Sequence, residues 1–593
     1  MKKGLFKNIS NKAYYSTLIV IAVAIVVLLN IIASFFTLRY DLTKDKRYSL
    51  TPTTVSFLSD ESALSNRILF KVYLEGDLPA EVQRLRTAIK DKLDEFKYYT
   101  GKNIEYEFIN PNEGSKEDQE ALKEQLYDRG RGIRPVNISY RKKGTANILE
   151  IFPGATVEYA GTTVGSIRFL EGGSFALDNR LESLIQKSIN NIEYKLMQSI
   201  SKATRRTKKT VAFIHGHGEL GIPHSQGARR NIEDAYIIKD IILNESLDAL
   251  KDVDGIIIAE PTKKFSDKDR FIIDQFLMNG GNVMLFYNPL HIYNDSIRKR
   301  GMVHSTRKRI ELEKMIFDYG IKINEDLVVD ASYDQFVMPG IPRGFVNWYF
   351  YVRALGTSHP ISAMVDPVKL PYVSSLQFVE NDNKIKAAVI LTSSSNARSY
   401  GNAPLLSIAI EQNFGENPQF QDDPEDPDNR IMLGAIVEGE FESAFKNRIA
   451  PMYADSPDAL FEEKSVKPGK LMVVGNGTFF KNAYYDSVFV REEGKYRYIP
   501  RLPRQGEIDE LLATNYKLGN FDFFENCVDY MLGESTLLSI RSRTIDLHPT
   551  DKLKVEKHGS FYKFINLFVP VLFIILLALT SYLIRYYKYV KRN

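Results

Sequence analysis

Two long apolar runs, one near each end, constrain this chain more than any other feature of its sequence. The first extends from Ala13 to Leu38 and the second from Phe564 to Ile584, and neither contains a charged side chain. An α-helix rises about 1.5 Å per residue, and the hydrocarbon layer of a membrane is roughly 30 Å thick. Each run can therefore cross a membrane, and we expect two transmembrane helices, over residues 13–38 and 564–584.

Each run has an alternative interpretation. The apolar region of a cleaved signal peptide is about 7–15 residues long and ends in small residues. The first run is longer and ends in Phe35-Phe-Thr-Leu38, which favours an uncleaved anchor. The second run could be a buried core helix, but it follows Lys563 and precedes a basic tail, as is common beside a membrane span.

The charges beside the two runs predict the orientation. Residues 1–12 and 585–593 contain basic residues and no acidic ones, and such flanks stay in the cytoplasm. The basic residues are Lys2, Lys3, Lys7, Lys12, Arg585, Lys588, Lys591 and Arg592. We therefore expect both termini to be cytoplasmic and the bulk of the chain to lie on the far side. In a Gram-negative bacterium the protein would lie in the inner membrane, with that bulk in the periplasm.

Charge and cysteine content argue against two classes of function. The whole chain carries a formal charge of +4, so the region between the runs is at about −4 once the eight flanking basic residues are removed. Nucleic-acid binding needs a concentrated basic surface and is not expected. Cys527 is the single cysteine, so an intramolecular disulfide, a Cys-x-x-Cys redox site and a thiolate zinc site are excluded.

After a connector over residues 39–66, we expect a first α/β domain over residues 67–204. The apolar periodicity predicts strand, helix, strand, helix, strand, strand and helix in that order. The predicted strands cover residues 68–74, 104–109, 136–140 and 148–152, and the last helix covers residues 179–202. This order is typical of a thioredoxin-like fold, here without the redox cysteines.

A second domain, over residues 205–545, is expected to be a doubly wound, Rossmann-like α/β sheet. Near-continuous apolar strands at residues 210–214, 236–243, 253–259 and 283–287 alternate with helices, which is typical of strands covered on both faces. Prolines and aromatic residues predict an irregular insertion at about residues 330–430. A helix at residues 521–532, a final strand at residues 537–545 and a stalk at residues 546–563 complete the expected order.

The most distinctive local segment is His215-Gly-His-Gly-Glu219, which directly follows a predicted strand. It is therefore expected at the carboxyl edge of the sheet, where open α/β folds bind ligands. His215, His217 and Glu219 are candidates for ligand binding, and imidazole with carboxylate also binds zinc. A structural turn is the alternative, since glycine permits tight backbone geometry. We favour the turn and predict no metal site.

Two further residues are candidate ligand contacts. Asn476 lies in the turn after a predicted strand at residues 470–474. Trp348 lies in an aromatic stretch, residues 345–351, that could stack on a sugar or on a partner surface. Packing inside the protein is the alternative for that stretch.

Nothing in the sequence predicts catalysis or a cofactor. Cys527 lies beside Phe523, Phe524 and Val528 on an amphipathic helix, which is typical of a buried, inert thiol. The sequence has no Gly-x-Ser-x-Gly nucleophile elbow and no Gly-x-x-x-x-Gly-Lys-[Ser/Thr] phosphate loop. We expect a protein that is not an enzyme, and a metal-dependent hydrolase built on His215 and His217 is the least favoured alternative.

Several segments together resemble a known family, and they occur in the same order along the chain. They are Tyr40-Asp-Leu-Thr-Lys-Asp-Lys-Arg-Tyr-Ser-Leu-Thr51, Tyr73-Leu-Glu-Gly-Asp-Leu-Pro-Ala80, His215-Gly-His-Gly-Glu219, Ile258-Ala-Glu-Pro261 with Gly280-Gly281, Gly475-Asn-Gly-Thr-Phe-Phe480, Asn520-Phe-Asp-Phe-Phe-Glu-Asn526 and Leu538-Ser-Ile-Arg541. The chain resembles the gliding-motility-associated ABC transporter auxiliary subunits, often labelled substrate-binding proteins and known as GldG. The resemblance covers most of the chain, although each segment is short.

The resemblance implies a non-catalytic auxiliary subunit whose outer domain is an interaction or coupling module. It implies as partners an ABC permease with multiple membrane spans and a cytoplasmic ABC ATPase, in the context of gliding and secretion. The family's Gly-Asp-Ser-Asp-Phe turn is Gly475-Asn-Gly-Thr-Phe479 here, and the loss of both acids argues against a charge-dependent ligand role there. A periplasmic-side receptor for a solute or glycan, with a pocket near His217, stays open as an alternative.

Overall fold

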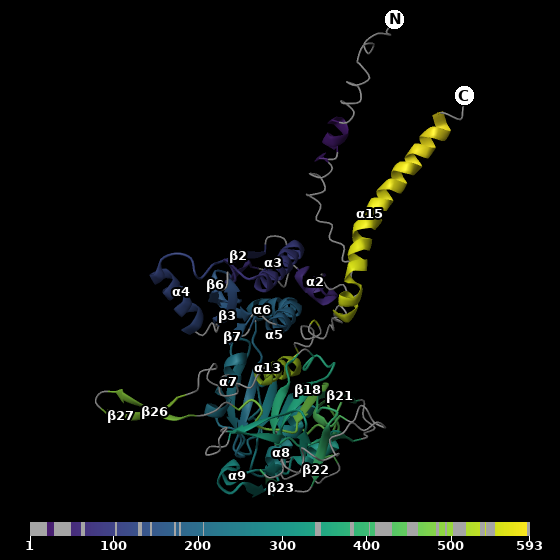
Figure 1. Cartoon of the computed structure of the whole chain (residues 1–593). Helices are drawn as coiled ribbons and strands as arrows, with labels where there is room; N and C mark the ends of the chain where they lie inside the picture. The colour runs from purple at the N-terminus through teal and green to yellow at the C-terminus, as the bar shows by residue number, and fades with distance from the viewer. Residues whose placement is uncertain are drawn as a thin grey trace. The chain divides into compact units, whose positions relative to one another are not determined.

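The computed structural model describes most of the chain. The described residues are 20–25, 27–28, 49–60, 66–100, 103–128, 133, 135–142, 145–170, 173–176, 179–204, 207–337, 345–363, 365–379, 385–401, 404–408, 430–446, 461–481, 485–492, 495–501, 518–533, 540 and 552–589. The chain forms two compact units, one of residues 50–543 and one of residues 1–49 with 544–593 (Figure 1).

The N-terminal part of the larger unit is built on a four-stranded sheet in the order β2-β1-β5-β6. β1 (Ile68–Val72) and β2 (Ile104–Phe108) are parallel, and β5 (Gly154–Tyr159) pairs antiparallel with both β1 and β6 (Thr162–Arg168). α3 (Ala80–Thr100) connects the two parallel strands, and its buried residues recur at helical spacing. They are Val82, Leu85, Ile89, Leu93 and Phe96. β1, β2, β5, β6 and α3 all contribute residues to one core cluster.

This sheet differs from the expected one in its membership. The two strands predicted between residues 136 and 152 are present as β3 (Val136–Lys142) and β4 (Thr145–Ile151), but they form a separate three-stranded sheet with β7 (Gly173–Ala176). The hairpin β5–β6 replaces them, and the polar, largely exposed residues of β6 hide it from a hydrophobic pattern. The thioredoxin-like architecture of this region stays a prediction.

The long helix predicted over residues 179–202 is two helices in the structure. α5 (Asn179–Asn190) and α6 (Ile192–Thr204) are separated at Asn191. Both contribute buried residues to the same core as α3. The other helices before the ten-stranded sheet are α2 (Pro52–Leu58) and α4 (Lys116–Asp128).

The rest of the larger unit is built on a ten-stranded sheet in the order β17-β18-β21-β24-β25-β11-β10-β8-β9, with β19 paired to β18. The five parallel strands are β9 (Ile237–Ile242), β8 (Thr210–His215), β10 (Gly255–Ala259), β11 (Asn282–Phe286) and β25 (Gly469–Val474). The antiparallel strands are β24 (Met432–Gly439), β21 (Ile385–Thr392), β18 (Phe345–Gly356), β17 (Tyr333–Val337) and β19 (Val368–Pro371). The chain is therefore a mixed α/β protein, as the sequence predicts.

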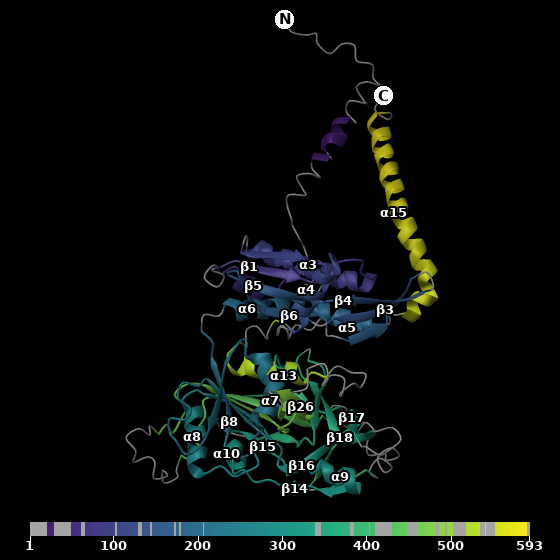
Figure 2. The same cartoon turned by 90° about the vertical axis from the view of Figure 1, so that its left-hand side faces the viewer.

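Helices cover both faces of the parallel half. Alternate residues of each strand point to opposite faces, so that in β10 Ile257 and Ala259 join one cluster and Ile256 and Ile258 the other. α7 (Ile222–Ile232) and α13 (Asn520–Met531) pack on the first face, and α8 (Asp267–Met278) and α10 (Glu313–Asp318) on the second (Figures 1 and 2). The helix predicted over residues 521–532 is thus confirmed as α13.

Residues 330–430 differ from the irregular insertion that their prolines predict. Their described part supplies β17, β18, β19 and β21 to the ten-stranded sheet, and Val352, Ala354, Ile390 and Leu391 lie in its core. Residues 421–429 and the prolines at 339 and 342 lie outside the described residues. The reason for the difference is that β18 is long and rich in aromatic and β-branched residues, which suit a pleated sheet.

The described part of this region also contains two-stranded pairs that are separate from the ten-stranded sheet, and one further helix. The pairs are β12 (Leu290–His291) with β14 (Thr306–Arg307), β13 (Met302–His304) with β23 (Leu405–Ser407), β15 (Ile321–Ile323) with β20 (Leu376–Phe378), β16 (Asp326–Asp330) with β22 (Ala397–Gly401), and β26 (Tyr485–Glu492) with β27 (Lys495–Arg501). The helix is α9 (Asn294–Arg300). The final strand predicted at residues 537–545 lies outside the described residues except at Ile540.

The smaller unit contains α15 (Lys552–Tyr589), which includes Pro570. Within it, Lys563–Tyr587 is long and apolar enough to cross a membrane, with a mean hydropathy of 2.6, and is the one such helix in the described part of the chain. Of the first apolar run only residues 20–25 and 27–28 are described, and they are helical and exposed. The span predicted there therefore stays a prediction.

We expect the core beneath α13 to dominate the stability of the larger unit. Phe524 is fully buried against Phe213, Phe286 and Phe480. Replacing it, as Phe524→Ala, should lower the free energy of unfolding by about 3–5 kcal/mol, because the lost ring leaves a cavity. Urea denaturation of the full chain in detergent measures this. Tyr98→Ala, at a side chain that is 70% exposed, is the control and should leave the midpoint unchanged.

Candidate functional site

The carboxyl ends of the parallel strands define the region where an α/β sheet of this kind binds ligands. After β8 the chain passes to β9 on one side, and then to β10 on the other side of β8. This reversal makes the crevice between the β8 and β10 loops the topological switch point. The segment from His215, the last residue of β8, to Glu219 lies at this point.

His215 and His217 take different partners. The Nε2 atom of His215 lies 2.8 Å from Oδ1 of Asp240, whose carboxylate also accepts hydrogen bonds from Arg229 at 2.5 and 3.1 Å. His217 instead has its Nε2 atom 3.2 Å from Oδ2 of Asp269 on α8. The two imidazoles therefore do not converge on one position.

His217 is buried between two carboxylate side chains, those of Glu219 and Asp269. Its Nδ1 atom is 3.5 Å from Oε1 of Glu219, its backbone N–H donates to Oε2 of the same residue at 2.7 Å, and its ring stacks on Phe265 at 3.8 Å. Burial acts to lower the pKa of His217, but the carboxylates of Glu219 and Asp269 outweigh it and raise this pKa above 6.5. The cluster therefore favours the imidazolium and holds the loop to α8.

Backbone contacts close the switch-point crevice. The carbonyl of His217 accepts hydrogen bonds from the N–H groups of Thr262 at 2.9 Å and Lys263 at 2.8 Å, and Leu220 N–H donates to the Ala259 carbonyl. A Cβ atom at Gly218, whose φ is +77°, would lie 2.0 Å from the Thr262 hydroxyl. The two loops therefore pack on each other here, and glycine is required for the fit.

The arrangement offers no metal centre in the parts of the chain that the structure describes. Among these residues no group of three or more His, Cys, Asp or Glu side chains is placed to hold a metal ion. The Nε2 atom of His217 is used by Asp269, and its Nδ1 atom faces Glu219 as an ion pair at 3.5 Å.

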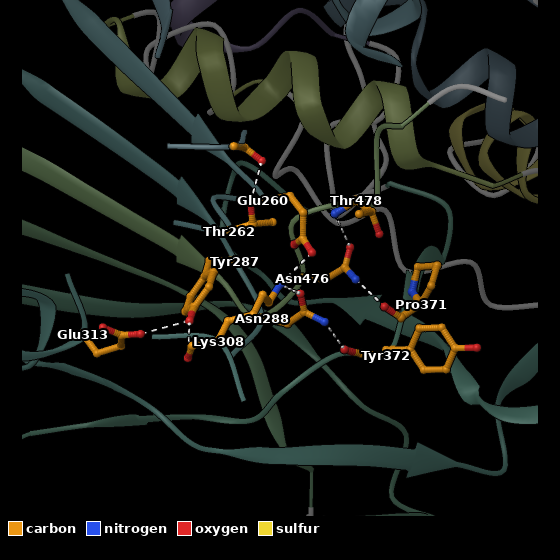
Figure 3. Close-up of polar contacts among 11 residues, drawn as sticks. Glu260, Thr262, Tyr287, Asn288, Lys308, Glu313, Pro371, Tyr372, Asn476 and Thr478 are labelled. Carbon is orange, nitrogen blue, oxygen red and sulfur yellow. Dashed lines mark hydrogen bonds and ion pairs between the residues drawn. The ribbon is translucent and has the colours of Figure 1, made fainter. Parts of the chain in front are cut away.

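A second polar cluster occupies the carboxyl ends of β10, β11 and β25 (Figure 3). Lys308 is 7% exposed, and its ammonium group donates to Oε1 of Glu260 at 2.6 Å and to Oδ1 of Asn288 at 3.1 Å. The Asn288 amide donates in turn to the carbonyl of Tyr372 at 2.9 Å. This cluster, Glu260, Asn288 and Lys308, is called the edge cluster below. It ties residues from distant parts of the chain to one end of the sheet.

Asn476 and Gly477 complete this edge. Asn476 is fully buried, donates its amide to the Pro371 carbonyl and accepts from the N–H of Thr478 at 3.0 Å. A Cβ atom at Gly477 would lie 2.2 Å from Oε2 of Glu260, so the carboxylate occupies the space that a side chain would need. Asn476 therefore holds the β19 end against the turn after β25, and its polar atoms are used within the protein.

Sequence reasoning did not identify the edge cluster. Glu260 appears in the sequence only within the Ile258-Ala-Glu-Pro261 segment, and Lys308 lies in a basic run that is typical of an exposed loop. A signal was present in part: Glu260 directly follows a fully apolar strand and so had to lie at the same edge as His217. Lys308 carries no comparable signal, because its partners are 48 and 20 residues away.

Trp348 does not offer a stacking surface. It is 1% exposed, and its ring packs against Phe336 at 5.5 Å and Phe350 at 5.3 Å between ring centroids. These rings belong to one core cluster, to which β18 contributes Trp348 and Phe350. The aromatic stretch therefore packs within the protein, because alternate residues of a strand face inward and Trp348 is one of these.

Helix α6 makes polar contacts at both of its ends. Near its start Glu193 accepts hydrogen bonds from the Thr51 N–H and the Thr54 hydroxyl, each at 2.7 Å, at the beginning of α2. Near its end Lys202 donates to Glu525 of α13 at 2.6 Å. One helix thus joins α2, which follows the first apolar run in sequence, to the helix that covers the ten-stranded sheet.

Further contacts strengthen the junction between α6 and α13. The Gln198 amide donates to Glu525 at 3.0 Å and to Asp529 at 3.3 Å, and Asp529 accepts from the hydroxyl of Tyr236 at 2.6 Å. The Lys202 and Glu525 side chains are 24% and 18% exposed. Partly buried ion pairs with several hydrogen bonds hold their geometry better than exposed pairs.

A groove lies away from these loops. It encloses about 790 Å³ and is lined by Asn324, Asp326, Ser375, Leu376, Gln377, Phe378, Ser399, Arg430, Ile431 and Met432. The Asp326 carboxylate inside it already accepts from Ser375 and from the Ser399 hydroxyl. A smaller pocket of about 190 Å³ lies between the loops that follow β1 and β2.

We expect the edge cluster to depend on the pairing of its charges. Lys308→Met should lower the free energy of unfolding by about 3–5 kcal/mol, because the Glu260 carboxylate is left buried without a cation. The double variant E260Q/K308M should recover most of that loss. Chemical denaturation of the full chain measures both, and Lys264→Met, which removes an exposed ion pair with Glu311, is the matched control. Equal losses in the single and double variants would contradict this account.

The pH dependence of stability should report on His217. Because its pKa is raised in the folded state, the imidazolium stabilises the fold fully below pH 6.5, and this contribution disappears as the pH rises through the raised value. The melting temperature of the wild type should therefore fall more steeply as the pH rises above 6.5 than that of His217→Gln. Parallel curves for the two proteins would show that the contact with Glu219 and Asp269 does not favour the charged ring.

Comparisons with known proteins place the chain near a transport family. Residues 208–499, just under half of the chain, match the model of a family described as an ABC-type uncharacterized transport system. Residues 44–158 match a domain of unknown function, DUF7088. An uncharacterized protein of Borreliella burgdorferi is 20% identical over 459 residues, which cover 76% of this chain and 79% of that protein.

One solved structure, titled mmIFT52 N-terminal domain, is 14% identical and covers 57% of this chain and 100% of its own. Its TM-score of 0.31 is too low to support a conclusion about fold or function. The family match supports an auxiliary protein of an ABC-type transport system, in a transporter-associated and non-catalytic role.

Proposed function

We propose that this chain is a non-catalytic, membrane-anchored auxiliary subunit of an ABC-type transporter complex linked to gliding motility and secretion. Its partners are an ABC permease with multiple membrane spans and a cytoplasmic ABC ATPase. It lies in a bacterial inner membrane with both termini in the cytoplasm and its bulk in the periplasm, where the α/β region is an interaction or coupling module. The match of residues 208–499 to a family of ABC-type transport systems carries this proposal.

The chemistry of the sheet edge supports a role without catalysis. The polar groups at the carboxyl ends of the parallel strands bond mainly to one another: His217 with Asp269, and Lys308 with Glu260 and Asn288. Groups committed to internal contacts are poorly placed to contact a substrate. The sequence also lacks a phosphate loop, so ATP hydrolysis belongs to another chain.

The contacts of α6 support a coupling role. α2 follows the first apolar run in sequence, and Glu193 fastens its first turn to α6. The other end of α6 is fastened through Lys202 and Gln198 to α13, which packs on the ten-stranded sheet. A displacement of α2 would therefore be passed through one stiff helix to that sheet, since a helix held at both ends moves as a unit.

A receptor for a solute or glycan is the second candidate. The groove lined by Asp326, Gln377 and Arg430 favours it, because it combines hydrogen-bonding groups with an exposed aromatic side chain, Phe378. A receptor would show saturable binding of one solute, abolished by changes in this groove.

The subunit hypothesis is tested by purifying the tagged native chain in mild detergent and identifying by mass spectrometry what is recovered with it. We expect a multispan permease and an ATPase in stoichiometric amounts. Recovery of the chain alone across several detergents would contradict the proposal.

The coupling role is tested on the recovered complex. Lys202→Glu places a negative charge beside Glu525 and Asp529 and should break the contact between α6 and α13. We therefore expect the ATPase to stay bound, but its rate should differ from that of the wild type because it no longer depends on the outer region. Lys97→Glu, at an exposed residue of α3, is the matched control and should keep the wild-type rate. An unchanged rate in Lys202→Glu would exclude α6 as the coupling element.

A further inference from the structure

Strand β9 ends the ten-stranded sheet and has one open edge. Among the residues that the structure describes, it pairs with β8 alone, in an unbroken parallel register from Thr210 opposite Ile237 to His215 opposite Ile242. The sequence predicts a strand here that is covered on both faces, but the structure places it at the end of the sheet. Its six residues, Ile237-Ile-Lys-Asp-Ile-Ile242, contain no proline, glycine or bulge that would block a further strand.

The direction of each backbone group along β9 follows from two hydrogen bonds. Ile237 N–H donates to the Lys209 carbonyl and Leu243 N–H to the His215 carbonyl, so odd-numbered residues direct their backbone groups toward β8. Successive residues of a strand alternate, so the even-numbered residues direct theirs away from the sheet. Ile238, Asp240 and Ile242 therefore present an open row of N–H and C=O groups.

The side chains beside this row are apolar except for one free charge. Ile237 is 48% exposed and Ile242 is 65% exposed. Asp240 is occupied by Arg229 and His215. Lys239 is exposed, and no ion pair connects it to any residue that the structure describes. The open edge thus offers apolar contacts around one uncompensated positive charge.

A second copy of this chain does not fit the edge. A symmetric antiparallel pairing has its two-fold axis perpendicular to the sheet, so that opposite residues must point to the same face. One of the two registers that pair most of β9 sets Lys239 against itself. The other sets Asp240, which already pairs with Arg229 and His215, against itself and leaves Lys239 opposite Ile241 without an acidic partner. Like charges directly opposite each other are destabilising, and shifted registers pair only half of the strand or less.

We propose that β9 is a docking edge for an extended segment of a different protein, which adds to the sheet as a further strand. The segment carries an acidic residue opposite Lys239, between apolar residues that cover Ile237 and Ile241. The backbone groups of Lys239 point toward β8. If the added strand is antiparallel, Lys239 and the residue opposite it therefore form a non-hydrogen-bonded pair, in which the two side chains lie close together. The charge of Lys239 thus repels a second copy of the strand and attracts a segment with an acidic residue.

Hydrogen exchange of the full chain in detergent, read at single residues by mass spectrometry, tests the geometry first. The amides of Ile238, Asp240 and Ile242 should exchange fast, and those of Ile237, Lys239 and Ile241 slowly, because only the latter face β8. Equal protection along the strand would show that the edge is already covered and would overturn the proposal.

Two synthetic peptides of about ten residues test the occupant. Both alternate valine and threonine, and one has glutamate and the other lysine at its centre. The wild type should bind the glutamate peptide about three- to tenfold more tightly, with protection appearing at the three fast amides. Lys239→Glu should reverse the preference, and Ile242→Pro, which removes one outward N–H, should weaken both peptides. Lys97→Glu is the matched control for charge and should change neither.

Three further results would overturn the proposal. They are no binding of either peptide up to about 1 mM, a preference that Lys239→Glu leaves unchanged, and a concentration-dependent dimer that Ile242→Pro abolishes, which would make a second copy the occupant. The proposal goes beyond the subunit function. The peptide assay reports on β9 even if purification recovers the chain alone, so the two can fail separately.

Discussion

The larger unit depends on the burial of both faces of its parallel strands. In β8, β10, β11 and β25 the apolar residues divide between two core clusters, and the helices α7 and α13 on one face and α8 and α10 on the other cover them. A sheet buried in this way can meet other molecules only at its strand ends and at its terminal strand. The carboxyl ends and the open edge of β9 are therefore the places where function had to be sought.

At the carboxyl ends, the cost of burying charge explains the arrangement. Lys308 is buried, and a buried ammonium group is stable only with close acceptors, which Glu260 and Asn288 provide. Because these residues come from separate loops, their pairing fastens the long connection between β11 and β24 to the sheet. His217 does the same for the β8 loop and α8 through Asp269. The loops at this edge thus stabilise the fold and leave little polar surface for a substrate.

The polar contacts of α6 connect the two α/β parts of the larger unit. Glu193 holds α2, and Lys202 with Gln198 holds α13, so that the helix belongs to one core and bonds to the cover of the other. This arrangement agrees with an auxiliary subunit that transmits a displacement. The match of residues 208–499 to an ABC-type transport family agrees with it as well. The open row on β9 adds a surface at which such a subunit can take up a partner strand.

The sequence by itself determined the local elements and the chemical character of the chain. The periodicity of α3 and α13, the apolar strands β8, β10 and β11, and the apolar helix near the C-terminus were readable, because they depend on side chains close in sequence. The position of the His215–Glu219 segment at the carboxyl edge followed from the strand before it.

Only the tertiary structure decided which strands share a sheet, that β9 lies at its end, and that Lys308 reaches Glu260 across 48 residues. It also decided that Trp348 is buried. Such contacts depend on the packing of distant segments, which a local pattern does not encode, because the same alternation suits an edge strand, a central strand and a separate hairpin.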